Sequence, residues 1–227
     1  MKTAVFFKLI SRLRDPQTGS FRHLWILLFY PVYLISFFIL ENVTLSYHVV
    51  ECSADALIPF CEWFLIPYVL WHALIALLSL YLLFFDFQGL KKLIAYFAIT
   101  YLIAFSAYII WPTCQNLRPT EFDRDNPLIW LTVHVIYGTD PSTNVSPSMH
   151  VLGAIGLWMA ARRTPRFSGR FARCCWFIVC LAICLSTVFL KQHSLLDLLT
   201  ALPAALFGWL VVYSGLIRKK SKPSQLQ

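Results

Sequence analysis

Several apolar runs of about 20 residues constrain this chain more than any other feature of its sequence. A helix of that length crosses the hydrocarbon core of a bilayer, and soluble domains seldom contain such runs. The composition agrees, because 59% of the residues are hydrophobic and 13% are charged, whereas an average soluble domain is about 25% charged. The sequence therefore predicts an all-α, polytopic membrane protein.

The apolar runs predict a bundle of six transmembrane helices over residues 23–217. Pro31 in the first run predicts a kink, and the fourth run is so short that we expect its helix to extend beyond it. A basic segment at 1–22 is predicted to lie on the membrane surface, and a basic tail follows at 218–227. The predicted spans are residues 24–40, 62–85, 93–111, 149–161, 174–190 and 195–216.

The basic residues predict the orientation of the bundle. All but three of the 19 Lys and Arg residues fall in the first segment, a predicted turn at 86–92, a predicted hairpin at 162–173 and the tail. These segments share one side of a six-span protein, and the positive-inside rule makes that side, with both termini, cytoplasmic. Topology thus explains the net charge of +8 without a nucleic-acid partner. The remaining cations are Arg118, Arg124 and Lys191.

Two stretches at the ends of apolar runs place histidines on the opposite, extracytoplasmic side. His150 begins the fourth run, and His193 precedes the sixth run, with Asp197 one helical turn later. A carboxylate at this spacing can accept the ring N–H of His193 and leave the other nitrogen as a nucleophile or base. His150 can then give a proton to a leaving group.

Phosphate-binding groups are predicted at the same membrane face. Arg118 and Lys191 supply positive charge, and Ser148 adds a hydroxyl at the start of a helix. Such parts suit phosphoryl transfer, in which positioning and charge stabilisation dominate. Zinc binding by the two histidines and the aspartate is the alternative, and the neighbouring cations disfavour it.

These residues resemble the three signature blocks of the type 2 phosphatidic-acid phosphatase superfamily of integral-membrane lipid phosphatases and phosphotransferases. Arg118-Pro119 is similar to the end of the first block, Pro147–His150 matches the second, and His193 with Asp197 matches the third. The resemblance covers roughly residues 60–215. An Asp-Pro pair and an asparagine just before the second block are similar to the inositol-phosphorylceramide-synthase-like branch.

The resemblance implies a division of roles and no metal or other cofactor. His193 would attack phosphorus and form a phosphohistidine, Asp197 would orient it, and His150 would protonate the departing oxygen. The residues expected to contact the phosphate or the rest of the substrate are Arg118, Asp140, Asn144, Ser148 and Lys191.

Two positions depart from the family pattern. Trp111 stands where the family has a lysine, and Thr187 stands where it has an arginine. Lys191 is expected to replace one of these cations, and Arg124 is a weaker candidate for the other. A more neutral site would suit a phosphodiester or an acceptor alcohol better than a phosphomonoester dianion.

The leading hypothesis is a lipid-phosphate phosphatase at the outer leaflet, acting on phosphatidic acid, phosphatidylglycerophosphate or a polyprenyl pyrophosphate. The first alternative is a phosphotransferase in which an alcohol, such as inositol, a sugar or another lipid, replaces water. The second alternative is a non-catalytic membrane scaffold or transporter, which would not need the paired histidines. We expect a bacterial plasma membrane, with a eukaryotic secretory membrane as the alternative.

Other candidate residues are less informative. In an oxidising compartment Cys52 and Cys61 would form a disulfide in the first outer loop, and free thiols are the alternative. His72 lies inside a predicted span, where it is expected to make a hydrogen bond in the bundle interior. His134 lies in an apolar stretch at 126–138 that predicts an interfacial or re-entrant helix, and it is a candidate to line the site.

Overall fold

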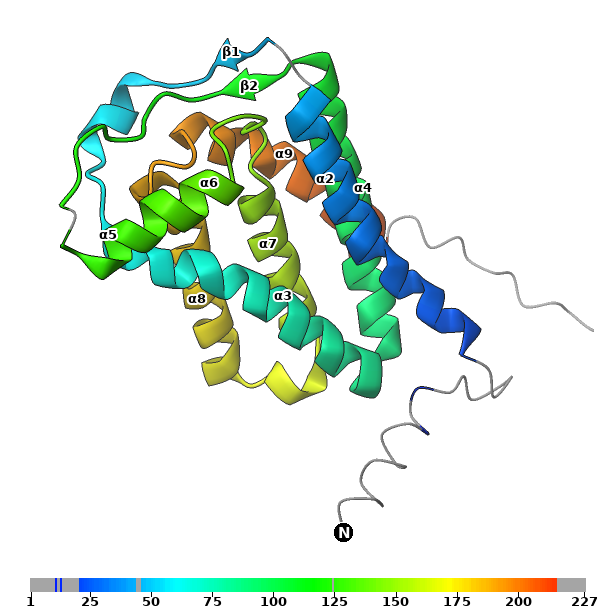
Figure 1. Ribbon diagram of the computed structural model, residues 1–227. Coiled ribbons are helices and arrows are strands. Elements are labelled where there is room, and N and C mark those ends of the chain that lie inside the picture. The colour runs from blue at the N-terminus through cyan, green and yellow to red at the C-terminus, as the bar shows by residue number, and fades with distance from the viewer. Residues whose placement is uncertain (1–10, 12, 14–20, 44–45, 124, 216–227) are drawn as a thin grey trace, which may run out of the picture.

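The computed structural model describes residues 11, 13, 21–43, 46–123 and 125–215. The tail, Arg124 and nearly all of the basic N-terminal segment lie outside the described residues. Within the described part the chain is mostly helical (Figure 1). The elements are η1 (Arg22–Leu28), α2 (Phe29–Val43), β1 (His48–Val49), η2 (Ser53–Leu57), η3 (Glu62–Phe64), α3 (Leu65–Phe85), α4 (Phe87–Ile110), β2 (Thr113–Cys114), α5 (Pro127–Leu131), η4 (Thr132–Ile136), α6 (Tyr137–Thr139), α7 (Met149–Ala161), η5 (Pro165–Phe167), α8 (Arg170–Phe189) and α9 (Leu195–Val212).

The long helices are of the kind that crosses membranes. Five helical stretches in the described part are long and apolar enough to do so, and they are His23–Val43, Glu62–Phe85, Phe87–Ile110, Arg170–Phe189 and Leu195–Val212. An all-α membrane bundle is therefore the right fold class. The fourth predicted span differs from the others, because α7 has 13 residues. At 1.5 Å per residue it measures about 20 Å, less than the roughly 30 Å of hydrocarbon core.

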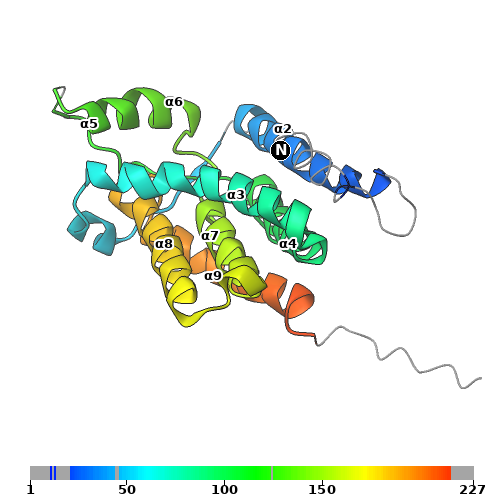
Figure 2. The ribbon, with the colours of Figure 1, turned by 90° about the horizontal axis from the view of Figure 1, so that it is seen from below.

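Helix α7 is short because it lies inside the bundle. It packs against α3, α4, α8 and α9, which surround it (Figure 2). Just before its first turn the Ser148 N–H donates to the Asp197 carbonyl at 3.1 Å, and at its C-terminal end the Thr164 hydroxyl donates to the Ala160 carbonyl at 3.0 Å. The expectation that this helix extends beyond its apolar run is therefore wrong.

Helix boundaries differ from the predicted spans where a cap or a turn decides them. Helix α4 begins six residues early because Asp86 caps it, accepting the Gly89 N–H at 2.9 Å, so the predicted turn at 86–92 shrinks to one residue. Helix α8 begins at Arg170, inside the predicted hairpin. Pro31 lies in the first turn of α2, just after the 3₁₀ segment η1, where a proline needs no kink.

The loops that the charge pattern predicts to lie on the outer side contain structure that the apolar pattern did not predict. Strands β1 and β2 pair in parallel, with His48 opposite Thr113, and join the first outer loop to the long one (Figure 1). The apolar stretch at 126–138 is helical, as predicted, and runs through α5, a π turn at η4 and α6. Cys52 and Cys61 are free thiols, so the alternative to a disulfide applies.

Candidate functional site

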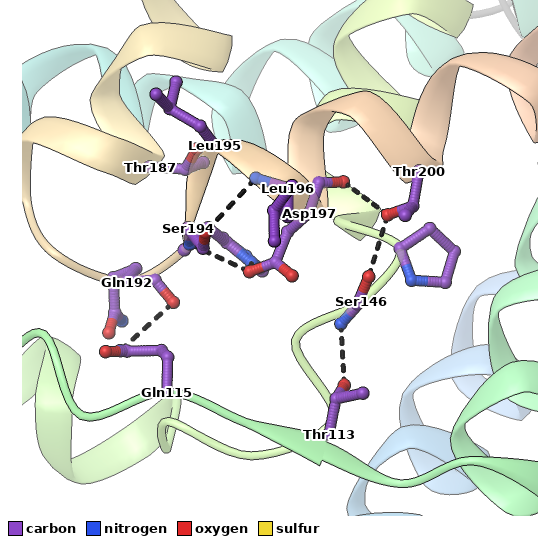
Figure 3. Close-up of polar contacts among 12 residues, drawn as sticks. Thr113, Gln115, Ser146, Thr187, Gln192, Ser194, Leu195, Leu196, Asp197 and Thr200 are labelled. Atoms are coloured by element: carbon purple, nitrogen blue, oxygen red, sulfur yellow. Dashed lines mark hydrogen bonds and ion pairs between the residues drawn. The ribbon is translucent and has the colours of Figure 1, made fainter. Parts of the chain in front are cut away.

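The two histidine-bearing stretches lie side by side, where α7 and α9 begin. The bond from the Ser148 N–H to the Asp197 carbonyl joins them directly. Figure 3 shows a second link, in which the hydroxyls of Ser146 and Thr200 lie 2.8 Å apart and the Ser146 N–H donates to Thr113 Oγ1 at 3.0 Å. These bonds fix the start of α7 against the start of α9.

Asp197 orients the ring of His193 and also caps α9. Its Oδ2 lies 3.3 Å from His193 Nδ1, the contact that an i, i+4 spacing allows. The same oxygen accepts the Ser194 N–H at 2.9 Å, while the Ser194 hydroxyl oxygen accepts the Leu196 N–H at 3.2 Å, which completes a capping box. Because Nδ1 faces the carboxylate, Nε2 of His193 is the nitrogen left for a ligand.

His150 faces His193 from the start of α7. The centroids of the two rings are 6.0 Å apart. Tyr68 and Trp71 of α3 hold the His150 ring, with centroids at 4.4 and 4.3 Å. The Nε2 of His150 and the hydroxyl of Ser148 are buried and have no hydrogen-bond partner in the described part of the chain. Buried polar groups without a partner are costly, so the His150 nitrogen, whose residue lines the cavity described next, is available to a ligand.

Both histidines line one cavity of about 190 Å³. Asp140, Asn144 and Gln192 contribute polar groups to its lining. The opposite wall is apolar and consists of Tyr33, Leu34, Phe37 and Phe38 of α2. The cavity therefore joins a polar end, where the histidines lie, to a wall that suits a hydrocarbon group.

Neighbouring helices hold Asp140 and Asn144 at the cavity. The Tyr68 hydroxyl donates to the Asp140 carboxylate. Asn144 has a left-handed backbone with φ of 50°, and its Nδ2 donates to Glu41 Oε1 of α2 at 2.9 Å. That bond leaves the Asn144 Oδ1, buried and without a partner among the described residues, as an acceptor.

Arg118 lies behind the cavity wall, and protein acceptors surround its guanidinium. It donates to the carbonyls of Tyr137 at 3.2 Å and Asp140 at 2.6 Å, and to the side-chain oxygen of Gln192. Burial lowers the pKa of Arg118, and nearby Tyr137 and Asp140 partly oppose that effect. The Nε of Arg118 is buried without a partner among the described residues, and Arg118 is not one of the residues that line the cavity.

Lys191 requires a correction, because its ammonium group binds the first outer loop. The ammonium donates to the Asp55 carbonyl at 2.8 Å and to the Ile58 carbonyl, and the residue is 8% exposed. Burial lowers the pKa of Lys191, and the Asp55 carboxylate opposes that shift. Lys191 is thus a tie between two loops, and it is not one of the residues that line the cavity.

The positions that depart from the family pattern are occupied by residues with other contacts. Trp111 is exposed and stacks on His48 with ring centroids 3.8 Å apart. The carbonyl of Thr187 accepts the N–H groups of Gln192 at 2.9 Å and His193 at 3.0 Å, which shapes the loop that carries the nucleophile candidate.

Sequence reasoning missed the importance of Asp55, a buried carboxylate in the first outer loop. It accepts the Ser194 hydroxyl at 2.6 Å, the Leu195 N–H at 2.8 Å and the Cys52 N–H at 2.8 Å. Burial raises the pKa of Asp55, but these bonds lower it more, so the pKa lies below its ordinary value. The sequence shows only a carboxylate in that loop, and no spacing rule relates it to α9.

Two other histidines complete the set of candidates, and one of them, His72, lies differently from expectation. His72 is exposed on α3 instead of buried in the bundle, and it lines the cavity. His134 lines a separate hollow, with its ring centroid 5.0 Å from that of Trp130.

The site therefore offers two imidazole nitrogens and an amide oxygen around one cavity, and the buried Ser148 hydroxyl does not line that cavity. Among the described residues no group of three or more His, Cys, Asp or Glu side chains is arranged to hold a metal ion. Comparison with protein-family models, curated proteins and solved structures finds no match for this chain. The chemistry of the site is consequently argued from its own residues.

Proposed function

We propose that this chain is an integral-membrane lipid-phosphate phosphatase that works through a phosphohistidine at His193. One observation carries the proposal: the rings of His193 and His150 face each other at 6.0 Å across one cavity, and Asp197 holds Nδ1 of His193. Stepwise phosphoryl transfer requires a nucleophile, a group that orients it and a proton donor, which His193, Asp197 and His150 would supply.

The chemistry divides between the two histidines. In the first step His193 Nε2 attacks phosphorus, the bond to the leaving oxygen breaks, and that oxygen takes a proton from His150. In the second step water attacks the phosphohistidine, gives a proton to His150, and the phosphorus–nitrogen bond breaks. The imidazolium form of His193 in the transition state is stabilised by Asp197.

Apolar surface beside the cavity supports a lipid substrate. Aromatic and aliphatic residues of α2 form one wall, and a second hollow of about 390 Å³ shares His72 with the cavity. That hollow follows one stripe of α3 through Ile75, Ala76 and Leu83. A hydrocarbon chain lying there would leave its phosphate next to the histidines, at the extracytoplasmic face that the charge pattern favours.

A phosphotransferase is the second candidate, and the polar lining favours it. Asp140 and the unpartnered Oδ1 of Asn144 are acceptors at the cavity, whereas Arg118 lies outside the cavity lining and only its Nη atoms donate to protein oxygens. Acceptors bind the hydroxyls of an alcohol better than the oxygens of a phosphate dianion. In this alternative an alcohol replaces water in the second step.

The test is turnover of a panel of lipid phosphates by purified protein, with and without added alcohols. Long-chain, short-chain and chain-free phosphates in the panel test the hydrocarbon site, and we expect the long-chain members to be preferred. His193→Gln should abolish turnover, while His134→Gln, on a separate hollow, should not. Turnover that survives His193→Gln would rule out the nucleophile, and inactivity toward the whole panel would favour a non-catalytic role.

A further inference from the structure

The loop that contains Asp55 and Ile58 accepts hydrogen bonds from residues just before and just after His193. We call residues 52–61 the clamp. On one side Lys191 donates to the carbonyls of Asp55 and Ile58, and on the other side Ser194 and Leu195 donate to the carboxylate of Asp55. His193 lies between these attachment points, so the clamp restrains the backbone immediately before and after it.

Further bonds make the clamp itself rigid. The Cys52 N–H donates to the Asp55 carboxylate at 2.8 Å, and the Cys61 N–H donates to the Phe189 carbonyl at 3.0 Å, at the end of α8. Asp55 is 2% exposed and Ser194 is fully buried, so water competes little for their bond of 2.6 Å. Hydrogen bonds to a charged, buried acceptor are among the stronger ones in proteins.

We infer that Asp55 is the positioning residue for His193, and that the clamp holds Nε2 in line for attack on phosphorus. This inference rests on the proposed function. Asp55 lies behind the His193–Asp197 pair and acts through Ser194 and Leu195, which begin the helix that carries Asp197. Because reacting atoms must be aligned closely, a displaced loop reduces rate on the order of 100-fold while ground-state binding changes little.

The Asp55→Asn variant tests whether Asp55 affects the alignment of His193 separately from the binding of phosphate. The amide is nearly isosteric, and its oxygen can still accept one N–H. Its NH₂ group, however, would face the Cys52 N–H and could no longer accept the Ser194 hydroxyl. Ser194→Ala removes the same bond from the other side and serves if Asp55→Asn does not fold. Asp123→Asn, at an exposed carboxylate of the long outer loop, is the matched control.

The affinities for orthovanadate and for inorganic phosphate are measured by calorimetry in detergent and compared. Orthovanadate mimics the phosphoryl group during transfer. We expect Asp55→Asn and Ser194→Ala to weaken vanadate binding by about 10-fold or more and phosphate binding by less than about twofold, with thermal unfolding still cooperative. The control should match the wild type for both anions.

The outcomes separate the inference from the proposed function. If both variants bind vanadate as tightly as the wild type, or if their affinities for phosphate and vanadate fall equally, Asp55 does not position His193. The inference is then overturned, and the proposed function is unaffected. If the wild-type protein binds neither anion and turns over no phosphate ester, the proposed function fails and the inference fails with it.

Discussion

The residues around His193 show how a cation can serve a site without touching its ligand. Lys191 is two positions from His193, and its charge suggested a phosphate contact. The structure instead gives its ammonium two carbonyl acceptors in the clamp. Its backbone has φ of 54°, so Lys191 also forms the bend between α8 and the start of α9. At the scale of single residues, the surroundings of a side chain decide its role more than its charge does.

Lys191→Met distinguishes the two roles of this residue. Methionine is one atom shorter, keeps an unbranched side chain and leaves the two carbonyls without this donor, so we expect a kcat at least about 10-fold lower with KM changed by less than about threefold. Steady-state kinetics with the best substrate of the panel measure this, and Arg166→Met, at an exposed arginine beyond α7, is the control. A rise in KM at constant kcat would instead restore Lys191 as a phosphate ligand.

Asp55 also makes the stability of the protein depend on pH. Its folded-state pKa is below its ordinary value of about 3.9. The stabilisation from its carboxylate is therefore fully present above that pH and is lost as pH falls through the lower folded-state pKa. Melting temperatures of the wild type and Asp55→Asn should differ by a constant amount above about pH 5 and converge below about pH 4. A difference that does not change with pH would contradict the assignment.

At the scale of helices, the apolar pattern predicted the elements well and the outer loops poorly. The second predicted span, 62–85, has the predicted bounds, whereas the helix at 149–161 does not extend beyond its apolar run as expected. The early start of α4 depends on one cap by Asp86, which hydropathy does not register. The parallel pairing of β1 with β2 is a contact between loops far apart in sequence, and no local signal encodes it.

The same limit applies to the candidate site. The pairing of His193 with Asp197 could be predicted from their i, i+4 spacing in the sequence. The proximity of His150 and His193 was expected because the charge pattern along the whole chain predicts that both lie on one side of the membrane. The contacts of Asp55 and of Arg118 could not be predicted, because each reaches its partners through tertiary packing.

Close helix packing around α7 gives a prediction at this scale. A Cβ at Gly156 would lie 2.6 Å from Phe97 and 2.8 Å from Tyr96 of α4, whose side chains are buried. Gly156→Ala should therefore destabilise the bundle by about 1–3 kcal/mol, although alanine favours helix. A Cβ at Gly138 would meet nothing within 4 Å, so Gly138→Ala should leave stability unchanged or raise it. Thermal unfolding in detergent compares them, and equal stability of the two variants would contradict the close packing.

For the whole molecule, charge predicts a six-span topology. In the described part five helices are long and apolar enough to cross a membrane, and a further helix, α7, is too short to cross by itself and begins at the site. With α7 counted as a crossing, the basic hairpin before α8 and the long outer loop fall on opposite sides of the membrane. Glu121 and Arg166 are exposed reporters of those two segments.

Cysteine labelling in intact cells tests this orientation. In a variant without native cysteines, Glu121→Cys should react with a membrane-impermeant maleimide from outside. Arg166→Cys should react only after the membrane is permeabilised. Labelling of both positions from one side would contradict the six-crossing topology and the extracytoplasmic site.

The central claim is that His193 carries the phosphoryl group, and trapping that intermediate tests it most directly. Protein quenched in alkali during turnover of a phosphorus-labelled lipid phosphate should yield an acid-labile phosphohistidine on the peptide that contains His193. His193→Gln should yield none. Label on another residue, or steady turnover by His193→Gln, would contradict the claim.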